Sequence, residues 1–270
     1  MLTELGAYKL WGEDPERYWI FLRRIVPPVL RALCPSGGYG CERLPATGGA
    51  VIAANHFSGI DPPLIGIYSH RAVYYMTKIE LLSVPVLGEV FRWGGAFAVR
   101  RGESDRDAIR LARWLVREGH VVGMFMEGTR QQLGHPGPVH PGAVMIAAQE
   151  GVPIVPVGVD TFGWTVRSRR RGAVVWGEAI SLDDVPRTGK GYREGAAILE
   201  VELTRLWRLA AEAVAAGLPD RLPDGTERDP AIPPGKGHPV RGARPWADEP
   251  WAKGPLGPLY KAPGSYPPSI

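Results

Sequence analysis

Residues 50–61 read Ala-Val-Ile-Ala-Ala-Asn-His-Phe-Ser-Gly-Ile-Asp, an apolar run that ends in a polar turn. The run 50–54 predicts a short buried strand, and His56 follows it almost at once. Open α/β sheets bind ligands at the carboxyl ends of their strands, so we expect His56 at such an edge. Asp61 lies five positions further on, where a continuous helix would turn the two side chains apart. The imidazole and the carboxylate can meet only across a turn, which Gly59 makes easier.

Strands and helices alternate outward from this stretch. The predicted strands span residues 50–54, 73–76, 96–99, 121–125, 152–159 and 173–176. The predicted helices span residues 62–68, 104–118 and 143–149, and a last one carries apolar residues from 199 to 214 and stops near Gly217. This alternation predicts an α/β fold with a mostly parallel or mixed central sheet flanked by helices.

Residues 1–44 are predicted to form N-terminal amphipathic helices. Asp14-Pro15 has the residue types of a helix start, and apolar residues interspersed with arginines follow it. Pro27-Pro28 should divide this segment into two short helices, because proline removes a helix donor and clashes with the preceding turn. Two interpretations stay open: the segment lies at a membrane interface with its arginines near the headgroups, or it packs on the main domain.

The last part of the chain differs in composition from the rest. Residues 219–270 hold 13 of the 27 prolines and few aliphatic residues. Such a segment cannot bury enough apolar surface to fold, so we predict an extended or disordered Pro/Gly-rich tail. Residues 45–218 remain as the main domain.

Composition argues against several classes of protein. The net charge is only +4 and no recognition motif is present, which disfavours nucleic acid as a partner. Cys34 and Cys41 have neither metal-ligand nor redox spacing, which indicates a reduced, cytoplasmic protein. His135 and His140 have no third ligand near them in the sequence, so we predict a loop there and no metal site. No secretory leader opens the chain and no apolar run approaches the ~18 to 20 residues that span a bilayer.

A second polar segment follows the predicted strand 121–125. It reads Phe125-Met126-Glu127-Gly128-Thr129-Arg130. Gly128 lets the backbone approach a ligand closely, and Arg130 offers a planar fork that suits a phosphate. Glu127 would repel an anionic substrate, so we expect it to hold the loop by accepting hydrogen bonds from backbone or arginine groups.

Taken together and in this order, the segments resemble the glycerolipid acyltransferase family, typified by 1-acylglycerol-3-phosphate acyltransferases. The resemblance covers roughly residues 45 to 180 and makes residues 45–218 an acyltransferase domain. Its signature is a histidine, four residues and an aspartate, usually preceded by asparagine, as Asn55 is here. The resemblance implies that His56 is the general base and that Asp61 orients its ring. Ser58, between them, is expected to make local hydrogen bonds.

Three further blocks carry the resemblance. Residues 94–102 match a block that ends in a phosphate-contacting arginine, with which Arg101 aligns best and beside which Arg100 lies. The segment 125–130 matches a block that binds the acceptor phosphate, which implies such a role for Glu127, Gly128, Thr129 and Arg130; Met126 replaces the usual proline. The strand 152–158 matches a fourth block, in which Pro156 is expected to shape the strand beside the acyl site and to be mainly structural.

The resemblance implies an O-acyltransferase of phospholipid biosynthesis. The acyl group would move from acyl-CoA or acyl-carrier protein to the hydroxyl of a lysophosphatidic-acid-like acceptor, with no cofactor and no metal. The protein would be cytoplasmic and peripheral on the inner face of the cell membrane.

Several alternatives stay open. The acceptor is another lysophospholipid or polar lipid, or the protein is a thioesterase using the same histidine and aspartate, or it is a membrane-binding module. The basic run at residues 167–171 either meets anionic lipid or carrier phosphates, or forms an exposed hairpin turn.

Overall fold

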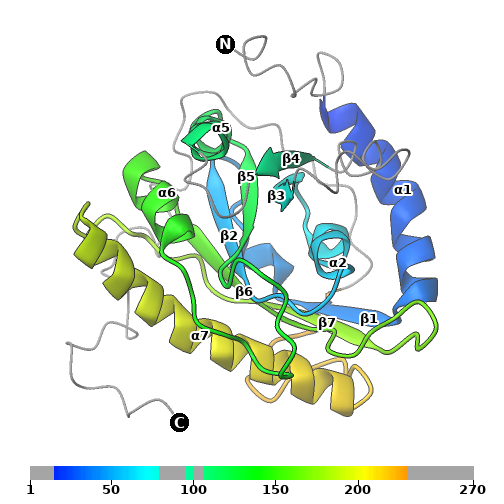
Figure 1. Ribbon diagram of the computed structural model, residues 1–270. Coiled ribbons are helices and arrows are strands. Elements are labelled where there is room, and N and C mark those ends of the chain that lie inside the picture. The colour runs from blue at the N-terminus through cyan, green and yellow to red at the C-terminus, as the bar shows by residue number, and fades with distance from the viewer. Residues whose placement is uncertain (1–14, 79–94, 100–105, 230–270) are drawn as a thin grey trace.

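A mixed sheet forms the centre of the protein (Figure 1). The computed structural model describes residues 15–78, 95–99 and 106–229. Within those residues the sheet has seven strands in the order β1-β7-β6-β2-β5-β3-β4. The strands are β1 (Ser36–Tyr39), β2 (Ala50–Ala54), β3 (Val73–Lys78), β4 (Ala96–Val99), β5 (Val121–Phe125), β6 (Ile154–Asp160) and β7 (Gly172–Trp176). The helices are α1 (Pro15–Leu33), the 3-10 turn η1 (Cys41–Arg43), α2 (Asp61–Tyr68), α5 (Arg106–Arg117), α6 (Gly142–Glu150) and α7 (Gly189–Ala215).

The predicted α/β fold is confirmed, and the sheet is mostly parallel. Neighbouring strands run parallel except β6 and β7, which pair antiparallel. Strand β2 lies between β5 and β6, with Ala54 opposite Phe125 and Ala53 opposite Pro156. The carboxyl end of β2 therefore opens between the ends of two other parallel strands, where ligands bind in such sheets.

Helices cover both faces of the sheet (Figure 1). On one face α5, α6 and the first part of α7 pack against Val51 and Ala53 of β2. On the other face α2 and part of α1 pack against its alternate residues, Ala50 and Ile52. Successive side chains of a strand point to opposite faces, so an apolar run without polar alternation indicates a strand buried on both sides.

The prediction of two N-terminal helices is wrong, because α1 is one helix that contains Pro27 and Pro28. Each proline leaves one carbonyl of the preceding turn without its usual donor. Arg24, in that turn, is exposed, so water can replace the missing donor there. Val26 and Leu30, before and after the prolines, pack against the same core as α2. Tertiary packing thus keeps the helix continuous.

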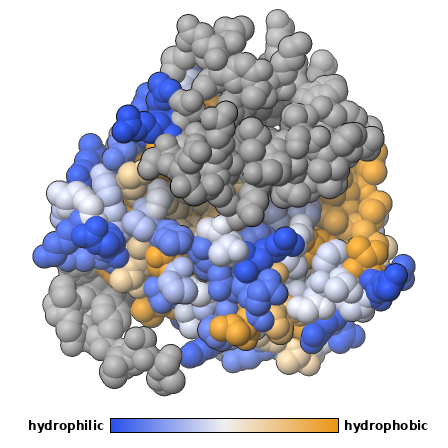
Figure 2. Space-filling model, viewed as in Figure 1, coloured by the Kyte–Doolittle hydropathy of each residue, from blue (hydrophilic) through white to orange (hydrophobic). Residues whose placement is uncertain are grey.

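One face of α1 remains exposed. Ile25 and Val29 lie one turn apart and are 48% and 53% exposed. In Figure 2, which has the same view as Figure 1, hydrophobic residues gather along the right-hand edge, over α1. None of the helices in the described ranges is long and apolar enough to cross a bilayer.

The folded body extends past both predicted domain boundaries. Residues 36–39 were assigned to the N-terminal segment, yet they form the edge strand β1. The pair Gly37-Gly38 has low strand propensity, which removed the sequence signal. Gly38 packs so closely on Tyr68 that an added Cβ would lie 2.2 Å from the ring.

At the other boundary, residues 219–229 pack on the body instead of extending from it. Arg228 bridges to Tyr39 of β1, the Asp229 amide donates to the Gly38 carbonyl at 2.8 Å, and Leu222 is buried. Residues 230–270, the rest of the predicted tail, lie outside the described residues.

The Cys34 thiol makes a hydrogen bond between the end of α1 and the connection from β6 to β7. Cys34 follows α1, is fully buried, and its Sγ donates to the Arg170 carbonyl at 3.4 Å. Trp164 of the same connection donates its ring N–H to the Leu33 carbonyl at 3.1 Å. Burial raises the pKa of Cys34 to about 12, with a smaller contribution from the charge of Asp61.

Candidate active site

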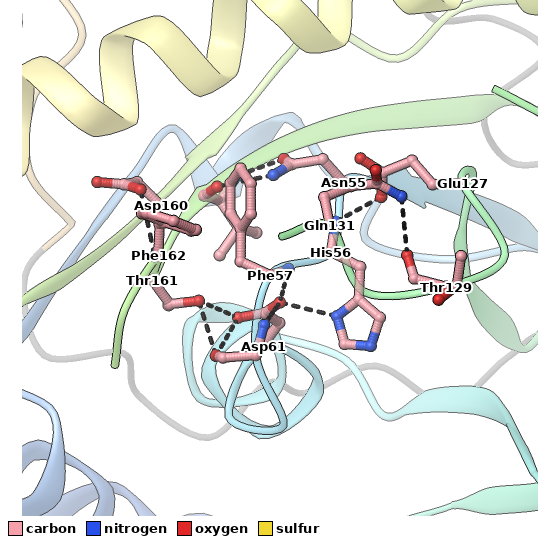
Figure 3. A network of polar contacts seen from close by, with 12 residues as sticks. Asn55, His56, Phe57, Asp61, Glu127, Thr129, Gln131, Asp160, Thr161 and Phe162 are labelled. Carbon is pink, nitrogen blue, oxygen red and sulfur yellow. Dashed lines mark hydrogen bonds and ion pairs between the residues drawn. The ribbon is translucent and has the colours of Figure 1, made fainter. Parts of the chain in front are cut away.

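The chain leaves β2 through an asparagine that is bonded to the neighbouring strand. The Asn55 side chain donates to the Val159 carbonyl at 2.8 Å and accepts the Val159 amide at 2.7 Å, and Asn55 is 1% exposed. These two bonds imitate a strand pairing just beyond the end of β2 (Figure 3). They fix the backbone at the position from which His56 starts.

His56 and Asp61 meet across the predicted turn. The distance from His56 Nδ1 to Asp61 Oδ2 is 2.8 Å, and Asp61 is completely buried. The same oxygen accepts the amides of Phe57 and Ser58 at 2.7 and 2.8 Å. The carboxylate therefore holds the turn closed around itself, which explains how residues five apart come into contact.

Asp61 does not cap α2, although it stands at the start of that helix. Asp61 is the first residue of α2, the cap position belongs to Ile60, and no side chain makes a capping bond there. Pro62 and Pro63 follow in the first turn, where a missing amide hydrogen removes no helical bond. Asp61 thus directs its carboxylate back to the turn and His56 instead of forward to the helix amides.

Two hydroxyls bind the other oxygen of Asp61. Ser58 Oγ donates to Oδ1 at 2.8 Å, which confirms its predicted local hydrogen bonding. Thr161, at the end of β6, donates to the same oxygen by a short bond, and its Oγ1 lies 2.7 Å from Ser58 Oγ (Figure 3). Thr161 was not predicted as a site residue, since nothing in its local sequence distinguishes it. Its one signal is its place just after a predicted strand.

The His56 ring has one bonded nitrogen and one that points away from Asp61 (Figure 3). An ionised carboxylate only accepts hydrogen bonds, so Nδ1 carries the hydrogen and Nε2 keeps a lone pair. The ring stacks on Phe125 with centroids 4.0 Å apart, and its side chain is 11% exposed. The ring orientation is therefore fixed, and the lone pair of Nε2 can accept a proton. Phe125 was predicted only as the end of a strand.

Glu127 holds the backbone, as expected. Its carboxylate accepts the His56 amide at 2.7 Å and the Gly137 amide at 3.1 Å, and the residue is 3% exposed. Burial raises the pKa of Glu127 to about 7, and the charge of Asp61 also raises it, whereas the two amide bonds lower it. The Gln131 amide donates to the His56 carbonyl at 2.8 Å. Both backbone polar groups of His56 are thus bound by residues 127–131.

The structure brings the turn 127–130 next to His56 and leaves its last two side chains in solvent. Gly128 has φ +66°, a conformation that favours glycine, and a Cβ there would meet the His140 ring at 3.3 Å. Thr129 and Arg130 are exposed. Arg130 directly precedes Gln131, so it lies one residue from a backbone contact with His56. Arg100 and Arg101 lie outside the described residues.

Met126 and Pro156 are structural. Met126, where the resembled family has proline, is 2% exposed and packs in the core with α6. Pro156 lies opposite Ala53 in β6, and its carbonyl accepts the Gly177 amide at 2.8 Å.

In the described part of the chain, the side chains close enough together to share a metal ion are those of Cys41, Glu42 and Asp229. This group lies beside β1, where the Cys41 amide donates to both carboxylate oxygens of Asp229 at 3.3 Å.

Known proteins are similar to this chain over the region that contains these segments. Residues 38–160 match the model of the family described as Acyltransferase. The 1-acyl-sn-glycerol-3-phosphate acyltransferase of Bacillus subtilis is 34% identical over 119 residues, which are 44% of this chain and 59% of that protein. The human 1-acyl-sn-glycerol-3-phosphate acyltransferase beta is 32% identical over 134 residues, 48% of each chain. The chain therefore spans about half the length of these relatives.

The fold is also similar to that of a solved acyltransferase structure. The crystal structure of the 1-acyl-sn-glycerophosphate (LPA) acyltransferase PlsC from Thermotoga maritima aligns with a TM-score of 0.57 over 72% of this chain and 83% of that one. The sequence identity is 19%, so this likeness concerns the fold alone.

Proposed function

We propose that this chain, whose residues 38–160 match the model of the acyltransferase family, transfers an acyl group from a thioester to the hydroxyl of a lysophosphatidic-acid-like acceptor. The names of the relatives, 1-acyl-sn-glycerol-3-phosphate acyltransferases, support this choice of acceptor. The observation that carries the proposal is the bond of 2.8 Å between His56 and the buried Asp61, with the second ring nitrogen unbound by any described residue. A protein that only binds lipid has no need of a poised base.

The proposed reaction uses His56 twice. Nε2 takes the proton of the acceptor hydroxyl while that oxygen attacks the thioester carbonyl. The resulting tetrahedral intermediate expels the thiolate, which receives the proton from Nε2. Asp61 stays ionised and stabilises the transient imidazolium through Nδ1. The leaving thiol has an ordinary pKa of about 8.5, so its departure needs no covalent enzyme intermediate.

Arg130 and Thr129 are the proposed contacts to the acceptor phosphate. Both side chains are exposed on the turn that holds His56, so a phosphate bound there would place the acceptor hydroxyl close to Nε2. Arg101 is proposed as a second guanidinium, on the resemblance alone. Glu127 is proposed to support the turn, because both its oxygens already accept amides.

We also propose that the protein acts at the cytoplasmic surface of the cell membrane, with acyl-CoA or acyl-carrier protein as donor. The exposed Ile25 and Val29 of α1 support membrane contact, because one face of the helix packs on the body while the other offers apolar side chains to an interface. One face of α1 thus packs on the main domain, and the opposite face is the one proposed to contact the membrane.

The test is a product survey. The purified protein is incubated with one acyl thioester and a panel of lyso-lipids with and without a phosphate, and the products are identified by mass spectrometry. We expect a diacylated product from lysophosphatidic acid. Release of free thiol at a rate that no acceptor changes would instead identify a thioesterase, in which His56 activates water.

A further inference from the structure

Asp61 has more hydrogen-bond donors than its role toward His56 requires. Oδ2 accepts from His56 Nδ1 and from the Phe57 and Ser58 amides. Oδ1 is within bonding distance of the hydroxyls of Ser58 and Thr161. A carboxylate offers about four lone-pair sites, two on each oxygen, so the two hydroxyls occupy both sites of Oδ1 and the other donors fill those of Oδ2.

The hydroxyl hydrogens can be assigned by counting. Ser58, Thr161 and Oδ1 make three mutual contacts, yet the two hydroxyls supply only two hydrogens. Hydrogen bonds to a carboxylate are charge-assisted and stronger than bonds between neutral hydroxyls. Thr161 therefore donates its hydrogen to Oδ1, and the Ser58 hydroxyl, within bonding distance of both Oδ1 and Thr161 Oγ1, shares its hydrogen between them.

Among these donors, Thr161 alone lies outside the turn. His56, Phe57 and Ser58 belong to the segment that Asp61 closes, so their bonds cannot fix that segment relative to the sheet. Thr161 follows β6, two residues after Val159, which holds Asn55. The end of β6 thus binds the chain on both sides of His56. The Val159 backbone binds Asn55, and the Thr161 hydroxyl binds Asp61.

We propose that Thr161 is a positioning residue for the His56 base. Its hydroxyl fixes the rotation of the Asp61 carboxylate and disperses its charge, and both effects keep the hydrogen on His56 Nδ1 and the lone pair on Nε2. Only the kinetic consequences of this inference rest on the proposed function. The bond and the ring orientation exist whether or not the acceptor has been named correctly.

The test compares Thr161→Val with Thr161→Ser. Valine has the shape of threonine without the hydroxyl, and it leaves Oδ1 one donor short in a buried site, so we expect kcat to fall about 10- to 100-fold with KM changed far less. A less dispersed Asp61 charge attracts the protonated imidazole more strongly, so the acid limb of the kcat/KM profile should move to higher pH. Serine restores the hydroxyl and should recover most of the rate and the original profile.

Thr226→Val is the matched control. Thr226 is also buried, and its hydroxyl accepts a hydrogen bond from Arg43 Nη2 at 3.1 Å, on the β1 side of the molecule. This variant should lower the melting temperature without moving the pH profile. If Thr161→Val keeps the wild-type kcat and pH profile, or if Thr161→Ser is as impaired as Thr161→Val, the proposal is overturned.

A second measurement needs no substrate. The Nδ1 proton of His56 can be followed by NMR in the wild type, in Thr161→Val and in Thr226→Val. We expect a sharp downfield resonance in the wild type and in Thr226→Val, and an exchange-broadened or shifted one in Thr161→Val. An unchanged resonance in Thr161→Val would refute the positioning role. If the wild type transfers no acyl group yet this difference appears, the proposed function fails and the inference about Thr161 stands.

Discussion

The two loops that meet at His56 differ in how completely their polar groups are bonded. In the loop after β2, Asp61 is buried and accepts five donors, and Asn55 is bonded to β6. In the loop after β5, Thr129 and Arg130 extend into solvent. A general base works best when its geometry is fixed before the substrate arrives. A group that binds a charged ligand must instead stay accessible. The bonded loop after β2 therefore suits catalysis, and the exposed side chains after β5 suit ligand binding.

Replacing the base should have the largest effect. His56→Ala removes the proposed proton acceptor, so we expect acyl transfer to fall by about 10³ or more with folding intact by circular dichroism. His135→Ala, in an exposed loop position, is the control and should keep the wild-type rate. Near-normal turnover by His56→Ala would show that the well-bonded loop is structural and not catalytic.

Removing the proposed phosphate contact should have the next largest effect. Arg130→Ala should raise KM for a phosphorylated acceptor about 10- to 100-fold, because a charge-assisted bond is lost, and should leave kcat nearly unchanged. Steady-state kinetics with phosphorylated and unphosphorylated acceptors, and with Arg208→Ala on the exposed face of α7 as control, measure this. An equal effect on both acceptors would contradict a role in phosphate capture.

Glu127 lies in the loop after β5 and accepts the His56 amide of the other loop, so its titration tests how the two loops are coupled. Its pKa is raised from 4.5 to about 7 in the folded protein, so the folded state binds the proton more tightly than the unfolded chain does. The free energy of unfolding should therefore fall as pH rises through that window and level off above about pH 7. Glu127→Gln cannot titrate and should reduce this fall by about 3 kcal/mol, the linkage value of a shift from 4.5 to about 7.

Urea unfolding from about pH 4 to about pH 8 measures the change. The exposed Glu212→Gln should leave the slope as it is in the wild type. A wild-type slope that persists in Glu127→Gln would assign the titration to other carboxyls, such as Asp160, whose pKa burial also raises.

The smallest expected effect concerns arginines far from the base. The basic run at residues 167–171 lies in the connection of the antiparallel pair β6 and β7, so it is an exposed hairpin turn, and contact with anionic lipid remains a prediction. Arg167→Ala should weaken binding to anionic vesicles only several-fold, since one charge near such a surface contributes ~1 kcal/mol. Vesicle sedimentation with anionic and neutral lipid measures this. Loss of turnover on a water-soluble acceptor would mean that the run acts at the site instead.

Much of the fold followed from local patterns. The apolar runs that became β2 and β5 were predicted to the residue, because strands buried on both faces leave an uninterrupted signal. Strand β1 was missed because its glycines carry no such signal, and the continuity of α1 depends on packing that its prolines conceal. The antiparallel direction of β7 is likewise set by a short connection and not by composition.

The candidate site was predictable where its partners are close in sequence. The contact of His56 with Asp61, and the bonds of Ser58, followed from a short motif. Thr161 is 100 residues from Asp61 and reaches it only because β6 lies beside β2, so no local pattern could reveal it. The role of Glu127 was predicted by electrostatics, since a buried carboxylate needs donors and not a second anion.

The thiol at the end of α1 gives the molecule a built-in reporter. Cys34 is sealed between that helix and the hairpin, and its raised pKa keeps it from forming the thiolate that alkylating reagents attack, whereas Cys41 is only half-buried. A maleimide added to the native protein should therefore modify Cys41 first. The rate at which Cys34 is labelled would then report how fast α1 separates from the connection between β6 and β7. This measurement requires no engineered residue.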